Sequence, residues 1–438
     1  MRKRLLTGAL VIAMVASLSA CGDSADTTTA TTAAATEAAT EADTEAATES
    51  TEAQVKDEGV TEEATEAASE ETTEAGSEAA SGELTKEKYD SMTAEDLLAM
   101  ANIQDTQNLT DDEYYWLLDT YKFVDIDYDK LEMDYFNSIT YAALKQCKGG
   151  SSHRIMDRLV TSEYPQVRGV GYGSVSGFFG ASDKNVDKLV KALESETDEY
   201  CLFKAVDGLS NEMAKDPKVA EFIFKMAEHP NPLIRKRTAI AIGNTWSIGV
   251  EGTVDKIIEL MHDEDIEVRK NAVEYAGKLH DDAVVEPIVE ILNDPAQAKV
   301  HGSAIRGLAY MWLDFPFHKE TSEAAYRATM DYYSKTPRNQ DVPAWDGIGA
   351  FDTVSEKALT DNDWYSKATY FDPDEFSSIM ADVIADPDVN WLARGCAMKA
   401  VHSLAPDHFD SLEDAANACG DQKAVDEFNK QKEKYASE

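Results

Sequence analysis

Cysteine is scarce in this chain of 438 residues, which contains only five. No two of them form a Cys-x-x-Cys pair, and their irregular spacing predicts no metal site. A core of this size does not depend on disulfides, although an extracellular location would permit them. Apart from Cys21, each cysteine lies in an apolar, helix-like context, so we expect buried free thiols. These are Cys147, Cys201, Cys396 and Cys419.

The sequence also lacks the short motifs of common enzymes. It contains no Gly-x-Ser-x-Gly, no His-Glu-x-x-His, no phosphate-binding loop and no dinucleotide fingerprint. Asp125, Asp127 and Asp129 imitate the start of an EF-hand loop, but Lys130 and Phe136 stand where that loop needs Gly and Glu. We therefore expect no catalytic activity, no metal and no cofactor.

No segment has the apolar pattern of a β-strand, so the fold class is predicted to be all-α. Helix N-termini, by contrast, are easy to find. Thr93 and Thr110 each precede a cluster of acidic residues. A capping threonine followed by acids in the first turn is typical of a helix start.

Basic residues are few relative to acidic ones, 41 against 83, and the formal net charge is −42. Residues 22–85 contain 18 acids and one base, and residues 86–438 carry a net charge of −28. Such charge disfavours nucleic acid and anionic lipid headgroups as partners. A basic peptide remains possible, although a solvated acidic surface is the simpler explanation.

The first 20 residues are organised as a secretory signal. Three basic residues (2–4) precede an apolar run (5–15) that is too short to span a membrane. Leu18-Ser19-Ala20-Cys21 then resembles the lipobox of bacterial lipoproteins. The resemblance implies cleavage before Cys21 and acylation of its sulfur. The alternative is an ordinary secreted protein with a cysteine at this position.

Residues 21–85 follow the lipobox as a stretch of almost only Thr, Ala, Glu and Ser. They offer too little apolar surface to offset the entropy cost of ordering, so we predict a disordered tether. A lipobox followed by a long acidic, Thr-rich stalk resembles surface lipoproteins of Gram-positive bacteria. That resemblance implies a lipid-anchored, extracellular protein that contacts the cell membrane through its lipid alone.

An internal repeat of 32–34 residues organises the rest of the chain. Its equivalent positions are followed by small residues and then by a second apolar helix, and a helix pair with this period indicates an α-solenoid. A last copy begins near Leu392-Ala393, after a break. The equivalent positions are Arg168, Leu202, Arg235, Arg269 and His301.

The repeat resembles the short bacterial type of HEAT repeat. The resemblance rests on a Val-Arg or Ile-Arg pair, the small residues after it and apolar runs such as residues 282–289, and it covers about 162–312 and 386–404. It implies a HEAT-like α-α superhelix in which the repeated arginine pairs with carboxylates of the neighbouring unit. We therefore predict a structural ladder, rather than a ligand site, at Arg168, Arg235 and Arg269.

These features divide the chain into six segments. They are a lipoprotein signal peptide (1–20), a lipidated cysteine with a disordered linker (21–85), an N-terminal helical cap (86–160), HEAT-like repeats (161–312), an irregular aromatic-rich insertion (313–387) and a C-terminal repeat with capping helices (388–438).

One candidate binding surface is an acidic patch on the second helices of two consecutive repeats. Asp255, Glu259, Glu286 and Glu290 face away from the apolar stripe of those helices. HEAT geometry would place them on the concave surface. The alternative is an acidic face that is merely solvated.

A second candidate is the aromatic-rich insertion. Long loops within compact domains are often functional, and exposed aromatic rings contact sugars or peptides. The candidates are Trp345, Trp364 and Tyr365. The alternative is that these rings pack over the ends of the repeats as an irregular cap.

The expected function is binding or scaffolding at the cell surface, with a protein or peptide partner, because solenoids present extended surfaces to such partners. Two alternatives stay open. One is an enzyme or enzyme subunit, since similar HEAT-type repeats occur in lyase-related proteins that modify bound chromophores. The other is a lipoprotein receptor for a solute or carbohydrate, which the lack of strands disfavours.

Overall fold

The computed structural model describes residues 85–93, 96, 111–133, 151–173, 183–313, 320–335, 348–349, 359–360 and 362–436. By its internal contacts the chain divides into two units, Met1–Glu83 and Leu84–Glu438. All described residues belong to the second unit. The signal segment with Cys21, the linker, Cys147 and Trp345 lie outside the described residues.

Helices dominate the described residues, which hold no β-strand beyond one isolated bridge between Asp127 and Glu132. This confirms the predicted all-α class. The α-helices are α2 (Lys86–Ser91), α4 (Asp111–Asp119), α6 (Ser151–Val160), α7 (Pro165–Gly173), α8 (Asp183–Leu193), α9 (Glu199–Leu209), α10 (Pro217–Met226), α11 (Pro232–Ile242), α12 (Thr253–Met261), α13 (Ile266–Ala276), α14 (Val285–Asn293), α15 (Ala298–Trp312), α16 (Glu323–Lys335), α19 (Trp364–Lys367), α20 (Pro373–Ala385), α21 (Trp391–Leu404), α22 (Glu413–Ala418) and α23 (Gln422–Tyr435). The 3₁₀ helices are η1 (Thr120–Phe123), η2 (Ser210–Glu212), η3 (Thr245–Ser247), η4 (Gly277–Leu279), η5 (Asp282–Val284), η6 (Pro295–Gln297) and η7 (Pro406–Leu412).

Short polar side chains define where the repeat helices begin. Asp198, Asn231 and Asp265 each accept a hydrogen bond from a backbone N–H in the first turn of α9, α11 and α13. Asn390 does the same for α21. Each cap satisfies one of the backbone donors that a helix start leaves unpaired. The regular spacing of these caps therefore sets the period of the repeat.

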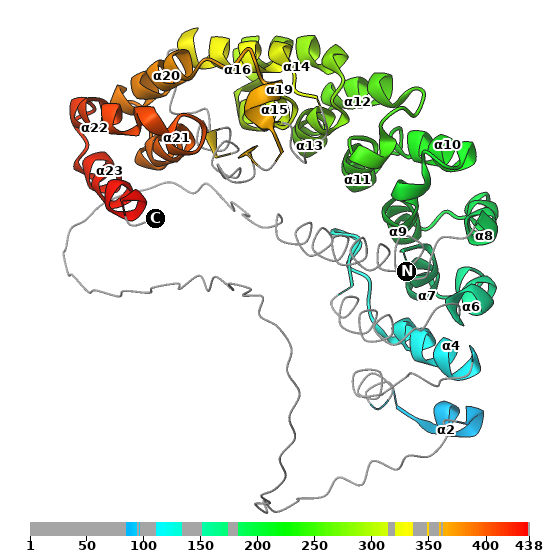
Figure 1. Ribbon diagram of the computed structural model, residues 1–438. Helices are drawn as coiled ribbons and strands as arrows, with labels where there is room; N and C mark the ends of the chain where they lie inside the picture. The colour runs from blue at the N-terminus through cyan, green and yellow to red at the C-terminus, as the bar shows by residue number, and fades with distance from the viewer. Residues whose placement is uncertain are drawn as a thin grey trace, which may run out of the picture. The chain divides into compact units, whose positions relative to one another are not determined.

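The repeat helices form two layers (Figure 1). The helices that carry the equivalent positions, α7, α9, α11, α13 and α15, form the first layer, and α8, α10, α12, α14 and α16 form the second. Neighbours in the first layer pack against each other extensively, whereas neighbours in the second layer have few contacts. The stack of repeats therefore bends with the first layer on its inner side.

Glycine allows the close approach within the first layer. A Cβ atom on Gly277 would clash with the backbone of Gly307, and one on Gly208 would clash with the backbone of Tyr172. These two contacts join η4 at the end of α13 to α15, and α9 to α7. A larger residue at either glycine would have to push the two backbones apart.

The second layer covers the first with apolar side chains at helical spacing. Helix α12 fully buries Ile257 and Met261, and α14 fully buries Ile288 and Ile291. Each such side chain stabilises the fold by roughly 1.5–3 kcal/mol relative to leaving it in water. The core is therefore one continuous layer between two rows of helices, as the apolar stripes predicted.

The described parts of the predicted irregular insertion (313–387) include two regular helices, α16 and α20. Helix α16 packs against α15 and α14, and α20 pairs with α21, so both helices continue the two-layer arrangement. Tyr326, Met330 and Tyr333 form the buried face of α16. On this face, tyrosines stand where the other second-layer helices have aliphatic residues. The sequence analysis therefore did not recognise the helical period here. No described helix has the length and apolar character needed to cross a bilayer.

Candidate functional site

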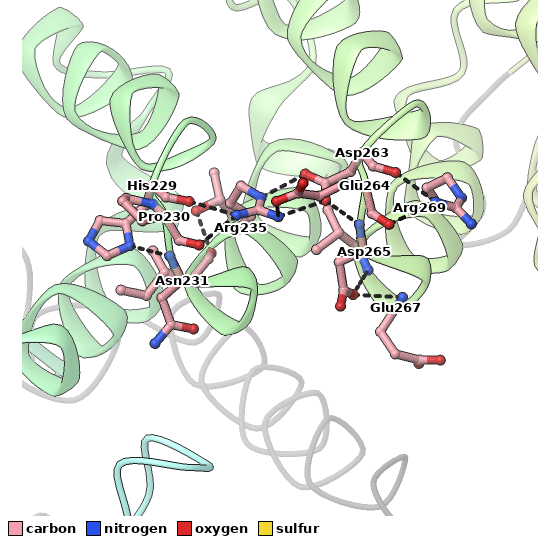
Figure 2. A network of polar contacts seen from close by, with 12 residues as sticks. His229, Pro230, Asn231, Arg235, Asp263, Glu264, Asp265, Glu267 and Arg269 are labelled. Atoms are coloured by element: carbon pink, nitrogen blue, oxygen red, sulfur yellow. Dashed lines mark hydrogen bonds and ion pairs between the residues drawn. The ribbon is translucent and has the colours of Figure 1, made fainter.

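Arg235 shows how the repeated arginine acts (Figure 2). Its Nε and Nη2 donate to the two carboxylate oxygens of Asp263 at 2.7 and 2.9 Å. Its Nη1 donates to the carbonyl oxygens of His229 and Pro230, each at 2.9 Å. The guanidinium therefore joins the turn before α11 to the turn before α13, the next helix of the first layer. These contacts agree with the structural interpretation of the ladder.

Arg168 on α7, at the N-terminal end of the first layer, repeats this arrangement. It forms a two-pronged pair with Glu196 at 2.8 and 3.2 Å and donates to the carbonyl of Ser162 at 3.0 Å. Both carboxylates lie 28 residues after their arginine. Planar forks of this kind suit bidentate pairing with a carboxylate.

Arg269 differs from the prediction that every arginine of the ladder pairs with a carboxylate. Its Nη1 donates to the carbonyls of Asp263 and Glu264 at 2.7 and 3.2 Å, and the carboxylate position 28 residues on is occupied by Gln297. Its Nε is buried with no hydrogen-bond partner. Arg269 therefore holds only the turn before its own helix.

The ion pairs lower the pKa values of their carboxyl groups. Burial alone would raise the pKa of Asp263, but hydrogen bonds from Arg235 and from the backbone of Asp265 outweigh it and hold the pKa below its usual value. The same balance lowers the pKa of Glu196, with Arg168 as the main donor. Both carboxylates are therefore charged at neutral pH, and each is paired with its arginine.

Two further residues belong to the ladder, although the sequence analysis assigned a structural role to neither. His301 occupies the equivalent position of α15, where its Nε2 lies 3.1 Å from the carbonyl oxygen of Asp294. Arg394, 2% exposed, donates to the carbonyl of Asp386 at 2.8 Å and to the carboxylate of Asp421 at 3.0 Å. The signal for Arg394 was its place four residues after the helix cap Asn390, the same spacing as between Asn231 and Arg235.

The acidic patch lies on a different side of the repeats from the one predicted. Asp255 and Glu259 on α12 and Glu286 and Glu290 on α14 are exposed, but both helices belong to the second, outer layer. The prediction of a concave patch was wrong because the helices with small residues pack closest and so take the inner side. Glu259 also pairs with Lys256 at 2.5 Å.

Trp364 is a core residue and not part of an exposed binding surface, which corrects that part of the prediction. It is 1% exposed, and its Nε1 donates to the carbonyl oxygen of Trp312 at 3.0 Å. Its ring lies 5.0 Å from the ring of Phe371 and 6.2 Å from that of Trp312, measured between centroids. For Trp364, the alternative of packing over the repeats therefore holds.

Tyr365 behaves differently from its neighbour. It is 42% exposed, and its hydroxyl donates to the carbonyl oxygens of Ser403 and Leu404 at 3.3 and 3.4 Å. These carbonyls belong to the last turn of α21. Tyr365 is therefore held at the surface by the end of a helix that lies almost 40 residues further along the chain.

A cavity of about 350 Å³ opens beside Tyr365, and we call it the Tyr365 pocket. It lies between the connection from α19 to α20 and the junction of α21 with η7. Tyr365, Asp407 and His408 are its polar residues. Its apolar residues are Ala368, Phe371, Pro373, Leu404, Ala405 and Pro406. The lining thus combines apolar side chains with polar groups, a combination that binding sites share.

Metal-ligand clusters and thiols are the remaining chemistry of the described residues. No group of three His, Cys, Asp or Glu side chains within the described ranges could hold a metal ion. Cys201 and Cys419 are buried free thiols, and burial raises the pKa of Cys201 well above its usual value. Cys201 is thus a poor nucleophile. Cys396 lies half-buried on α21.

Comparison with known proteins agrees with the observed repeats. Residues 226–309 match a family model of HEAT repeats, and this segment runs from the end of α10 into α15. The second unit therefore contains a HEAT-repeat-like domain within an all-α solenoid. An engineered protein of known structure aligns with 75% of this chain and 98% of its own length, at 16% identity and a TM-score of 0.36. A search of curated proteins finds no match.

Proposed function

We propose that this protein is a lipid-anchored binding or scaffold protein of the bacterial cell surface, and that it acts by binding rather than by catalysis. Its helical repeats would present a surface to a protein or peptide partner. The observation that carries this proposal is the Tyr365 pocket, a cavity with apolar and polar lining residues on the stack of helices. Stacked repeats of this kind suit extended polypeptide partners.

The proposed location rests on the leader of the chain. The lipobox-like Leu18-Ser19-Ala20-Cys21 and the acidic linker behind it support anchoring by an acylated cysteine. We expect a Cys21→Ala variant to be released from cells or to remain as an uncleaved precursor. Fractionation of cells, with detection of the protein in membrane and medium, tests this. A variant that is processed and retained like the wild type would refute the lipid anchor.

The proposed partner can be tested by capture from the native cell envelope. The mature chain serves as bait, beside a Tyr365→Ala variant and a Glu286→Gln, Glu290→Gln variant of the outer face. We expect the pocket variant to lose a protein that the wild type and the outer-face variant both retain. Capture that is equal for all three baits would show that the pocket is not the site of binding.

A further inference from the structure

We propose that the Tyr365 pocket binds a polypeptide segment in which a large apolar side chain stands next to, or one residue away from, a lysine or arginine. This inference rests on the proposed binding function and adds the chemistry of the ligand. It follows from four features of the pocket: its apolar walls, its acidic rim, the helix end that forms one side, and the way Tyr365 is held.

The walls of the pocket suit an apolar anchor. Phe371 and Pro373 line it from the start of α20, and Leu404 and Pro406 line it from the junction of α21 with η7. The volume of about 350 Å³ lies at the lower end of the range of ligand pockets. A cavity of this size fits the anchor of a peptide, and a buried anchor in such a cavity supplies much of the energy of an interface.

The rim of the pocket is acidic. Asp407 lines the pocket, and the carboxylate of Asp374 lies 3.5 Å from the Nε2 of His408, another lining residue. The Asp374 side chain is 87% exposed, so it faces solvent beside this lining residue. Both acids belong to a segment, residues 86–438, with a net charge of −28. A positive side chain would be drawn to this rim.

The two helix ends at the pocket reinforce this preference. Helix α21 ends at Leu404, a lining residue, so the partial negative charge of its C-terminus lies beside the pocket, where the Tyr365 hydroxyl offsets part of it by donating to the carbonyls of Ser403 and Leu404. Helix α20 begins at Pro373, but the carboxylate of Asp372 accepts hydrogen bonds from the backbone N–H groups of Asp374 and Glu375. The positive end of α20 is therefore already neutralised by Asp372, and a cation remains the favoured ligand.

Tyr365 gives the pocket a fixed edge. Its hydroxyl is bonded to the end of α21, and the buried Trp364 anchors the same short helix through the carbonyl of Trp312. A wall that is held in place before binding loses little entropy when a ligand arrives. The ring of Tyr365 therefore offers a preformed aromatic face beside the apolar cavity.

The test begins with a library of random dodecapeptides displayed on phage and selected on the full mature chain. We expect enriched peptides to place Leu, Ile, Phe or Trp next to, or one residue from, Lys or Arg. The enriched peptides are then synthesised with a fluorescent label, and their affinity is measured by anisotropy at low and high salt. Affinity should fall as salt is added, because part of the attraction is electrostatic.

Three variants locate the binding. The double variant Asp374→Asn, Asp407→Asn removes two rim charges. It should lower the affinity for the peptides about tenfold, which corresponds to about 1.4 kcal/mol. Tyr365→Ala should lower the affinity for the peptides further. Asp414→Asn removes an exposed acid from α22, outside the pocket, and should leave affinity unchanged. Melting temperatures of all variants show whether each remains folded.

Several outcomes would overturn the inference. These are enrichment of acidic peptides, no enrichment at all, or peptides that bind the folded rim variant as tightly as the wild type. The envelope capture described above stays informative in each case. If Tyr365→Ala still loses a captured protein, the proposed binding function stands and only the ligand chemistry fails. If capture is also unaffected, the pocket has no role in binding.

Discussion

Arg235 and Arg269 occupy the same repeat position but should differ in what they contribute to stability. Removing Arg235 leaves the carboxylate of Asp263, 8% exposed, without its ion pair. We expect Arg235→Ala to lower the free energy of unfolding by about 3 kcal/mol. Arg269 bonds only to backbone carbonyls, so Arg269→Ala should cost about 1 kcal/mol. Urea denaturation of both variants measures this difference, and equal losses would contradict it.

Lys204 should make the fold more stable as the solution becomes mildly alkaline. Burial lowers its pKa to about 8, and the nearby positive charge of Arg237 acts in the same direction. The folded state therefore disfavours the charged form. This cost starts to decline as the pH rises above about 8, where the folded state binds fewer protons than the unfolded state, and it is gone only above the pKa of the unfolded lysine, about 10.4. We expect Lys204→Met to melt at a higher temperature than the wild type at pH 7.

The control for this prediction is the same comparison at higher pH. The difference between Lys204→Met and the wild type should shrink between pH 7 and pH 9, since the wild-type lysine loses its charge over that range. Thermal melts followed by circular dichroism at several pH values would show it. A variant that melts at a lower temperature than the wild type at pH 7 would mean that the charge of Lys204 stabilises the fold.

At the scale of helices, the close contact between η4 and α15 depends on Gly277. A Cβ there would meet the backbone of Gly307, so Gly277→Ala must push two helices apart. We expect it to lower the free energy of unfolding by roughly 2–4 kcal/mol. Gly395→Ala on α21 is the matched control, because its Cβ would lie 3.4 Å from the side chain of Glu427. That change should be neutral or stabilising.

The helices also show how far sequence reasoning reached. The apolar spacing of α12 and α14 and the Val-Arg entry of α13 are local patterns, and they predicted the repeat and its core. Local patterns do not predict which of the two layers lies on the inner side of the stack. That depends on how closely the backbones of neighbouring repeats approach each other. Gly277 and Gly307 are 30 residues apart in the chain, and only the fold reveals their contact.

The sequence predicted an aromatic binding surface in this region but no pocket, for a similar reason. Trp364 and Tyr365 are adjacent aromatic residues on one short helix, and successive side chains on a helix point about 100° apart. One of the two must therefore face the core. The carbonyl of Trp312 binds Trp364, and the end of α21 binds Tyr365. Both partners are distant in sequence, so composition identified the region but not the exposed residue.

For the whole molecule, the excess of acid predicts that salt stabilises the fold. Residues 86–438 carry a net charge of −28, and like charges on a compact body repel each other. Raising the ionic strength from 0.01 to 0.1 M shortens the Debye length from about 30 to about 10 Å. We expect the melting temperature to rise over this range. A fall would mean that the surface ion pairs outweigh the general repulsion.

Acid should unfold the protein through its paired carboxylates. The pKa values of Glu196 and Asp263 are depressed in the folded state, so their ion pairs contribute fully above the pKa of the unfolded groups. That contribution is lost as the pH falls below about 4 and through the folded pKa values, since the folded state then binds fewer protons than the unfolded state. An Asp263→Asn variant should start less stable at pH 7 but lose less stability than the wild type between pH 5 and pH 3. Asp255→Asn, at an exposed position of α12, should keep the acid sensitivity of the wild type. If both variants respond to acid like the wild type, the ladder does not set acid stability, and the loss must come from carboxylates spread over the rest of the fold.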